Sequence, residues 1–183
     1  MPNLTRGGAA IDKLGNGGII NIDKNKIDVK GDNDILTLSS KFINPNESLY
    51  KNSDKIKPID GFDDIICHGS PEGLIINGMN NEEWIYTAKE AADMIRNSQE
   101  FKGRSIRLIS CQTGANGENS VAQQIADELG VDVMAPTEIV TVEPVEGKMF
   151  VSDNDILTRL WIRGENVVET GKWVIFKPRK VGE

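Results

Sequence analysis

Two residues that can do covalent chemistry follow two apolar segments of the sequence. His68, the chain's only histidine, follows Asp63–Cys67, and Cys111 comes 43 residues later, after Ile106–Ser110. A thiolate is a strong nucleophile, and a neighbouring imidazole can take up the thiol proton. Backbone N–H groups at Gly69 and Cys111 can stabilise an oxyanion, because glycine lets a substrate approach closely. The pattern predicts a His68/Cys111 dyad for acyl transfer, with Gly69 and Cys111 forming the oxyanion hole.

Both residues must lie at one edge of a sheet for this chemistry. Strand patterns at 62–68, 105–110 and 131–135 alternate with amphipathic helix patterns at 87–98 and 120–129. This alternation is typical of α/β folds in which helices cover a mostly parallel central sheet. A right-handed crossover makes the first two strands neighbours, and the carboxyl ends of parallel strands share one edge. The backbones of His68 and Cys111 should then lie one or two strand spacings apart, roughly 5–10 Å.

The regions outside this alternation are expected to be strands and loops. Glycines in the first eighteen residues indicate a flexible leader, and the alternation in 19–29 predicts a β-hairpin. The stretch 43–61 predicts a long surface loop, and 69–73 a turn. Short strand patterns at 138–142, 149–151, 160–162 and 173–176 predict a β-rich C-terminal flap. We expect one domain over 19–183, with its core in 60–178.

Other reactive or bulky side chains have structural interpretations. Cys67 is expected to point away from His68 into the core, since neighbouring residues on a strand alternate faces. Asp63 and Asp64 are expected to cap the start of the same strand. The three tryptophans should belong to the core or a lid: Trp84, Trp161 and Trp173. One histidine and two cysteines are too few for a structural zinc site, so no metal is expected.

Composition sets limits on the function. The 183 residues are 38% hydrophobic and 27% charged, as in an ordinary globular protein, and no apolar run is long enough to span a membrane. The first ten residues lack the apolar run of a signal peptide. The net charge of −7 argues against nucleic acid as the main partner, because phosphate binding needs a basic surface.

The charge is unevenly distributed. Residues 148–180 contain seven basic and four acidic side chains, a charge of +3, so the remainder carries −10. This stretch is either a solvated surface of mixed charge or an anion-binding face. The candidate polyanion-binding residues are Arg159, Arg163, Lys172, Lys177, Arg179 and Lys180.

The two motifs also resemble a known enzyme family. The sequences Ile65–Pro71 (IICHGSP) and Arg107–Gly114 (RLISCQTG) resemble the His and Cys motifs of caspase-like (clan CD) cysteine peptidases. A histidine about 50 residues before the cysteine is a general caspase signature. The resemblance is greatest to the cysteine protease domains of MARTX and large clostridial toxins and to C-terminal modules of polymorphic, Rhs-type toxins. Gly130–Thr137 and Gly171–Pro178 share it, so it covers about residues 60–178.

This resemblance implies a function and a setting. It implies a cysteine endopeptidase with a His68/Cys111 dyad and Gly69 in the oxyanion hole, which needs no cofactor. The substrate would be its own parent chain or a target-cell protein, after secretion or delivery within a larger bacterial toxin. Inositol hexakisphosphate is expected as an allosteric activator on the basic C-terminal face, and a cognate immunity protein as a partner. The caspase pentapeptide itself is absent, so a preference for aspartate at the cleavage site is not expected.

Two other functions fit the same residues. The dyad can serve another acyl transfer, such as glutamine deamidation or transamidation of a host protein. Alternatively, the domain is a non-catalytic recognition module in which the dyad is vestigial.

Overall fold

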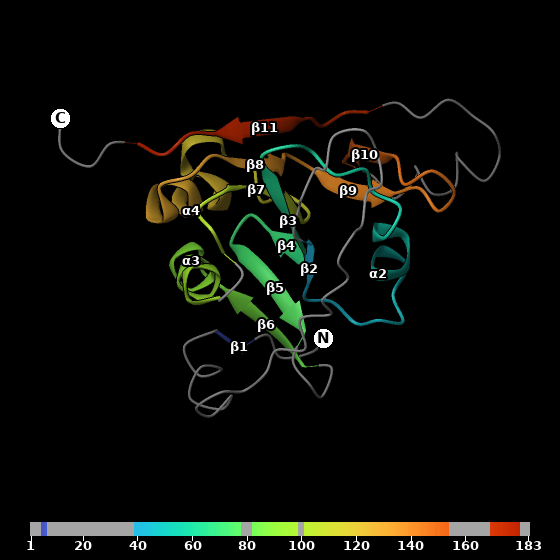
Figure 1. The fold of residues 1–183 in the computed structure, drawn as a ribbon, viewed down its shortest axis with the longest axis horizontal. Helices are drawn as coiled ribbons and strands as arrows, with labels where there is room; N and C mark the ends of the chain where they lie inside the picture. The colour runs from blue at the N-terminus through green and yellow to red at the C-terminus, as the bar shows by residue number, and fades with distance from the viewer. Residues whose placement is uncertain (1–4, 7–38, 78–81, 99–100, 154–168, 180–183) are drawn as a thin grey trace.

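The central feature of the fold is a five-stranded, mixed sheet. The computed structural model describes residues 5–6, 39–77, 82–98, 101–153 and 169–179 (Figure 1). The sheet has the order β11-β8-β7-β3-β2. Its four parallel strands are β2 (Ser39–Lys41), β3 (Phe62–Ile66), β7 (Ser105–Ile109) and β8 (Val133–Pro136), and β11 (Trp173–Phe176) pairs antiparallel with β8. The expected α/β class, with β3 and β7 as parallel neighbours, is confirmed.

A second sheet lies beside the first, with the order β1-β6-β5-β4. Its strands are β1 (Thr5–Arg6), β4 (His68–Ser70), β5 (Gly73–Asn77) and β6 (Glu83–Tyr86). The predicted turn over 69–73 is therefore wrong in extent, because only Pro71 and Glu72 lie between β4 and β5. The Glu72 N–H donates to the Ser70 hydroxyl (3.1 Å), which tightens the turn and lets pairing begin at Ser70 and Gly73.

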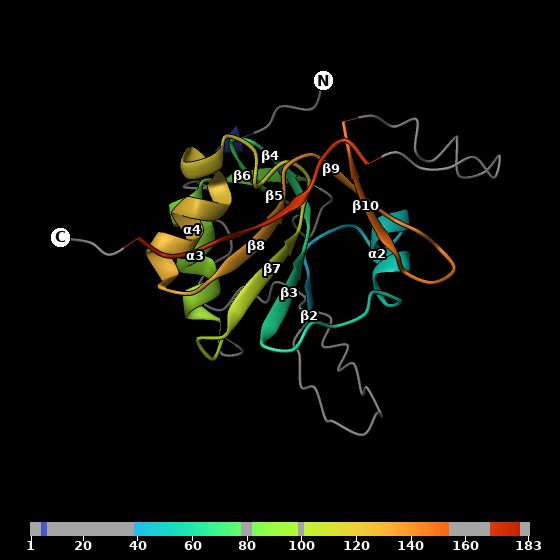
Figure 2. The ribbon, with the colours of Figure 1, turned by 90° about the horizontal axis from the view of Figure 1, so that it is seen from above.

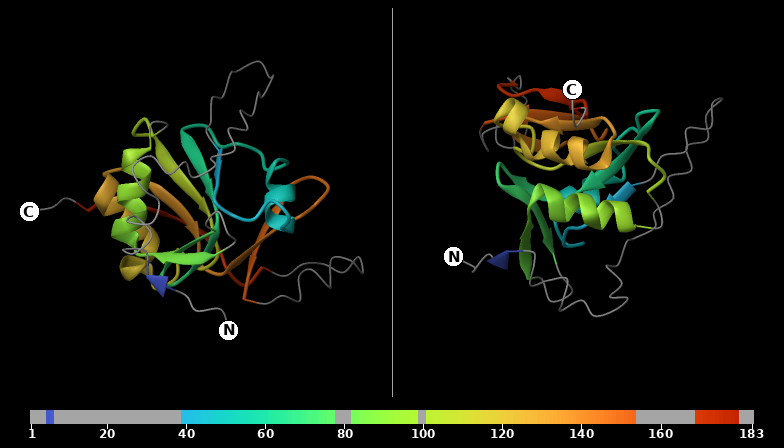
Figure 3. Two further views of the ribbon diagram at one scale, coloured as in Figure 1. Left: turned by 90° about the horizontal axis from the view of Figure 1, so that it is seen from below. Right: turned by 90° about the vertical axis from the view of Figure 1, so that its left-hand side faces the viewer.

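Two helices cover one face of the central sheet, as the sequence predicts. Helix α3 (Ala88–Asn97) begins with a capping box between Thr87 and Glu90. Helix α4 (Val121–Leu129) follows the short 3-10 helix η1 (Gly117–Asn119), is capped by Ser120, and ends at Gly130, whose φ of 70° is costly for other residues. The two helices pack together on the same side of the sheet (Figures 2 and 3).

The opposite face corrects a prediction. The stretch 43–61, expected to be an irregular surface loop, contains helix α2 (Ser48–Ser53) and the buried residues Ile43 and Ile56. This helix is held by a residue that lies outside it in the sequence. The buried Lys41 ammonium bonds Asp54 (2.5 Å) and lies 4.3 Å from the Tyr50 ring centre. Six residues are too short to show a helical period, which explains why the sequence gives no sign of it.

Helix α2 packs against a two-stranded hairpin on this face. The hairpin consists of β9 (Ile139–Val142) and β10 (Met149–Ser152), paired antiparallel. The Asn52 side-chain amide donates to the Val142 carbonyl (3.1 Å), which ties the helix to the hairpin. The hairpin and α2 therefore form one wall on the side of the sheet away from α3 and α4 (Figure 2).

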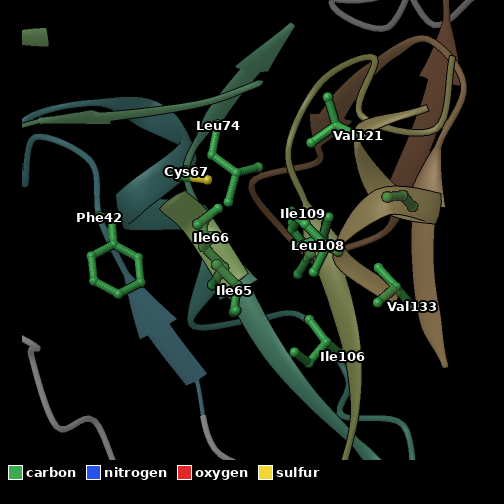
Figure 4. Packing of buried hydrophobic residues seen from close by; sticks show 14 of the residues in the cluster. Phe42, Ile65, Ile66, Cys67, Leu74, Ile106, Leu108, Ile109, Val121 and Val133 are labelled. Carbon is green, nitrogen blue, oxygen red and sulfur yellow. The ribbon is translucent and has the colours of Figure 1, made fainter. Parts of the chain in front are cut away.

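The core lies between the sheet and its helices. Ile66, Leu108 and Ile109 are at most 1% exposed, and Cys67 packs with Leu74 in this cluster (Figure 4). The prediction that Cys67 is a core residue is thus confirmed. Trp84 is buried in the core and Trp173 packs against its margin, whereas Trp161 lies outside the described residues.

Asp63 and Asp64 do not cap the strand as expected, because both lie within β3. Asp64 accepts two hydrogen bonds from its register partner Arg107 (2.7 and 2.6 Å), and Asp63 pairs with Arg104 (3.2 Å). Burial raises the pKa of Asp64 above its ordinary value, while the Arg107 hydrogen bonds and charge act in the opposite direction. Cations on β7 or directly before it allow these two acids to lie inside a buried strand.

Some predictions fall outside the described residues. These are the hairpin over 19–29 and the strand over 160–162. Thr5–Arg6, within the predicted leader, form β1 and pair in parallel with β6. Among the helices described here, none has the length and apolar character needed to cross a membrane.

Candidate active site

His68 and Cys111 follow the ends of the neighbouring parallel strands β3 and β7. The register pairs Ile66 with Ile109, and beyond it the Cys67 N–H donates to the Ile109 carbonyl (3.3 Å). The Ser110 hydroxyl then donates to the His68 carbonyl (2.9 Å), which keeps the segments after β3 and β7 together one residue beyond Cys67. His68 then enters β4 of the second sheet, so the β3–β7 register ends before the two residues of the predicted dyad.

Both side chains contact the wall that α2 and the β9–β10 hairpin form. The Cys67 sulfur lies 3.5 Å from the Ser110 oxygen, so the two residues that precede the predicted dyad residues lie together in the core. His68 meets Glu47, and the Cys111 thiol contacts the Val140 carbonyl (3.9 Å). Glu47 precedes α2 and Val140 lies in β9, the two elements that pack together on this face.

Glu47 is a candidate site residue that sequence reasoning missed. Its carboxylate oxygen Oε2 lies 2.5 Å from His68 Nε2, and each side chain is 33% exposed. Glu47 is the N-cap residue of α2, and its N–H donates to the Asn44 carbonyl (3.0 Å). The turn-forming residues Asn44 and Pro45 were a signal for the helix start, but nothing local pointed to His68, 21 residues away.

Gly69 lies where no side chain would fit. A Cβ atom built there would be 2.2 Å from the Ser110 hydroxyl, 2.7 Å from the Cys111 carbonyl and 2.8 Å from the Thr113 methyl. The Gly69 backbone therefore lies close to the Cys111 carbonyl. This close approach of two segments of the chain is a second reason for glycine at this position.

The loop after Cys111 is strained and tightly held. Gln112 has a φ of 59°, a region that side chains other than glycine seldom adopt, and its N–H donates to the Glu138 carbonyl (3.0 Å). The Thr113 carbonyl accepts from the Ala122 N–H (2.9 Å), so the loop folds back onto the first turn of α4. Strain of this kind persists only where the surroundings enforce it, and it concentrates at functional sites.

The two cysteines have different environments. Cys67 is fully buried, and desolvation raises its pKa to about 12 despite its contact with Ser110, so it stays a neutral thiol. Cys111 is partly exposed. Because only thiolates attack efficiently, any thiol chemistry of this fold belongs to Cys111.

Three of the six candidate polyanion-binding residues lie in the described part of the chain. Lys172, Lys177 and Arg179 are exposed, and Arg179 is engaged with Asp127 through two side-chain hydrogen bonds (2.5 and 2.9 Å). Arg159, Arg163 and Lys180 lie outside the described residues. In the described part of the chain, no group of three or more His, Cys, Asp or Glu residues is arranged to hold a metal ion.

These features define a mixed α/β domain with a histidine and a cysteine at the carboxyl edge of its parallel strands. Residues 38–151, well over half of the chain, match the family described as a domain of unknown function, DUF8616. The chain belongs to this family, and the matched region contains Glu47, His68 and Cys111. No curated protein and no solved structure matches the chain.

Proposed function

We propose that this protein is a caspase-like cysteine endopeptidase that uses a His68/Cys111 dyad. The observation that carries the proposal is that the two residues follow neighbouring parallel strands and contact the same wall, His68 through Glu47 and Cys111 through Val140. Partial exposure of Cys111, the close approach of Gly69 and the strain at Gln112 support it.

The proposed reaction is acyl transfer followed by hydrolysis. His68 takes the proton of Cys111, and the sulfur attacks the carbonyl carbon of the scissile peptide. As the oxyanion collapses, the C–N bond breaks and the leaving amine takes the proton from His68. A water molecule then gives a proton to His68 and attacks the thioester, which releases the acid and restores the thiol. No cofactor takes part in these steps.

Glu47 would orient the imidazole in this scheme. Its carboxylate lies at Nε2 of His68, so this nitrogen carries the hydrogen donated to Glu47 and Nδ1 is left to exchange a proton with Cys111. The carboxylate also stabilises the imidazolium that forms when the thiol is deprotonated.

We further propose that the domain is a module of a larger bacterial toxin, secreted or delivered into a target cell. Its substrate would be its own parent chain or a target-cell protein. This setting rests on the resemblance of the two motifs to toxin protease domains.

The test is cleavage by the purified protein. A fusion of this chain to its parent sequence and a denatured host-cell lysate are incubated with the protein, and new termini are read by mass spectrometry. Cys111→Ala and His68→Ala should each abolish cleavage, whereas Cys67→Ala, the matched control, should retain it. Circular dichroism confirms that each variant is folded. A parallel arm with inositol hexakisphosphate tests activation.

Two outcomes would overturn the proposal. Cleavage that survives in folded Cys111→Ala would remove the dyad from the reaction. Release of ammonia without new termini would point to glutamine deamidation or transamidation by the same residues.

A further inference from the structure

A cavity away from the dyad lies between the loop that follows α2 and the β9–β10 hairpin. Its volume is about 310 Å³, at the lower end of the range for small-molecule sites. Ile56, Ile59 and Met149 supply apolar wall, and the buried Arg107 side chain lines the interior. Arg107 is already neutralised by Asp64, so the interior offers mainly apolar contact.

The walls of the cavity are fixed in advance. The turn of the β9–β10 hairpin packs directly against the loop after α2. A Cβ at Gly147 would lie 2.2 Å from the Lys55 carbonyl, and the Lys55 ammonium bonds the Pro144 carbonyl. The Arg107 guanidinium holds the loop by donating to the Lys57 carbonyl (3.0 Å). A preformed cavity costs a ligand little reorganisation free energy.

The mouth of the cavity carries an excess of positive charge. Lys57 and Lys148 are exposed lining residues, and the acid among the lining residues is Glu146. The Glu146 carboxylate bonds the Lys148 ammonium (2.7 Å). This bond, and more weakly the charge of Lys57, lowers the pKa of Glu146. A carboxylate of the chain itself thus pairs with Lys148 at the place that an external anion would take.

From this arrangement we infer that the cavity binds a small amphipathic anion, an aromatic or aliphatic body with one carboxylate or sulfonate group. The body packs on Ile56, Ile59 and Met149. The anionic group lies between Lys57 and Lys148 and displaces Glu146. This inference is independent of the peptidase proposal, because the lining residues include neither His68 nor Cys111.

The test is titration of the full chain with 4-phenylbutyrate, followed by amide chemical shifts in NMR. Saturable shifts are expected at residues 56–59 and 146–149, and 4-phenylbutylamine, the matched cation, should bind at least about tenfold more weakly. Glu146→Gln removes the competing carboxylate and should tighten binding about threefold. Lys57→Ala with Lys148→Ala should weaken it, whereas Lys172→Ala, an exposed lysine elsewhere, should not.

Three results would overturn the inference. The first is the absence of saturable shifts at these residues, and the second is equal binding of the amine. The third is stronger binding of inositol hexakisphosphate than of 4-phenylbutyrate at the same residues, because it would show a polyphosphate surface instead. Met149→Trp fills the cavity with a larger side chain, so loss of the amide shifts in this variant shows that they come from ligand inside the cavity.

Discussion

Strands β3 and β7 run side by side, yet their middles and their carboxyl ends are built differently. In the middle, Asp64 and Arg107 are buried and satisfy each other with paired hydrogen bonds. At the ends, His68 and Cys111 remain partly exposed, and Gln112 adopts a strained backbone. The middle is arranged for stability, whereas the ends keep exposure and strain that stability does not require. That division is what a stable scaffold with a reactive edge should show.

The largest expected effect is in the strand middle. Arg107→Met leaves the Asp64 carboxyl buried without its cation, and should lower the free energy of unfolding by about 3–5 kcal/mol. Urea denaturation measures this loss. Arg104→Met is the control, because Arg104 is 32% exposed and should lose about 1 kcal/mol or less. Equal losses in the two variants would show that the Asp64–Arg107 pair has no special role.

The buried Cys67 thiol should make the free energy of unfolding depend on pH in the alkaline range. The folded protein keeps this thiol protonated to about pH 12, whereas the unfolded chain releases the proton near 9.0. The buried thiol therefore adds its full share to the free energy of unfolding below pH 9, and this share is lost as the pH rises towards 12. The total loss is on the order of 4 kcal/mol, of which about 2 kcal/mol is lost by pH 10.5. Urea denaturation of wild type and Cys67→Ala should give stability curves that converge over this range. Parallel curves would mean that Cys67 is not desolvated.

Gly69→Ala tests the close approach at the strand ends. The new methyl group collides with Ser110 and with the Cys111 backbone, which should cost about 1–3 kcal/mol and move His68 away from Cys111. Urea denaturation and the alkylation rate of Cys111 measure the two effects. Gly103→Ala is the control, because its Cβ would meet nothing within 4 Å and only its φ of 73° opposes the change. A Gly69→Ala protein with unchanged stability and reactivity would refute the tight contact.

The smallest effect is expected at Gln112. Gln112→Gly relieves a positive φ and should raise the free energy of unfolding by no more than about 1 kcal/mol, while it slows the reaction of Cys111 with iodoacetamide. Asn116→Gly, with a φ of 70°, should give the same gain without the change in reactivity. If the reactivity of Cys111 is unaltered in Gln112→Gly, the backbone strain at Gln112 has no role in the reaction.

The parts that the sequence predicted are those with a local signal. Helices α3 and α4 have apolar residues at helical spacing and recognisable caps, and the alternation of strands correctly set Cys67 in the core. The missed parts depend on contacts distant in sequence. Helix α2 is held by Lys41, and Glu47 reaches a histidine on another strand. Asp64 was predicted to cap the start of its strand, because its partner Arg107 comes 43 residues later in the sequence.

The most direct test of the proposed dyad is the pH dependence of Cys111 alkylation by iodoacetamide, followed residue by residue with mass spectrometry. We predict that at pH 7 Cys111 reacts faster than free cysteine while Cys67 stays unmodified, and that His68→Ala slows the reaction of Cys111. A Cys111 that reacts no faster than free cysteine, at the same rate with and without His68, would contradict it.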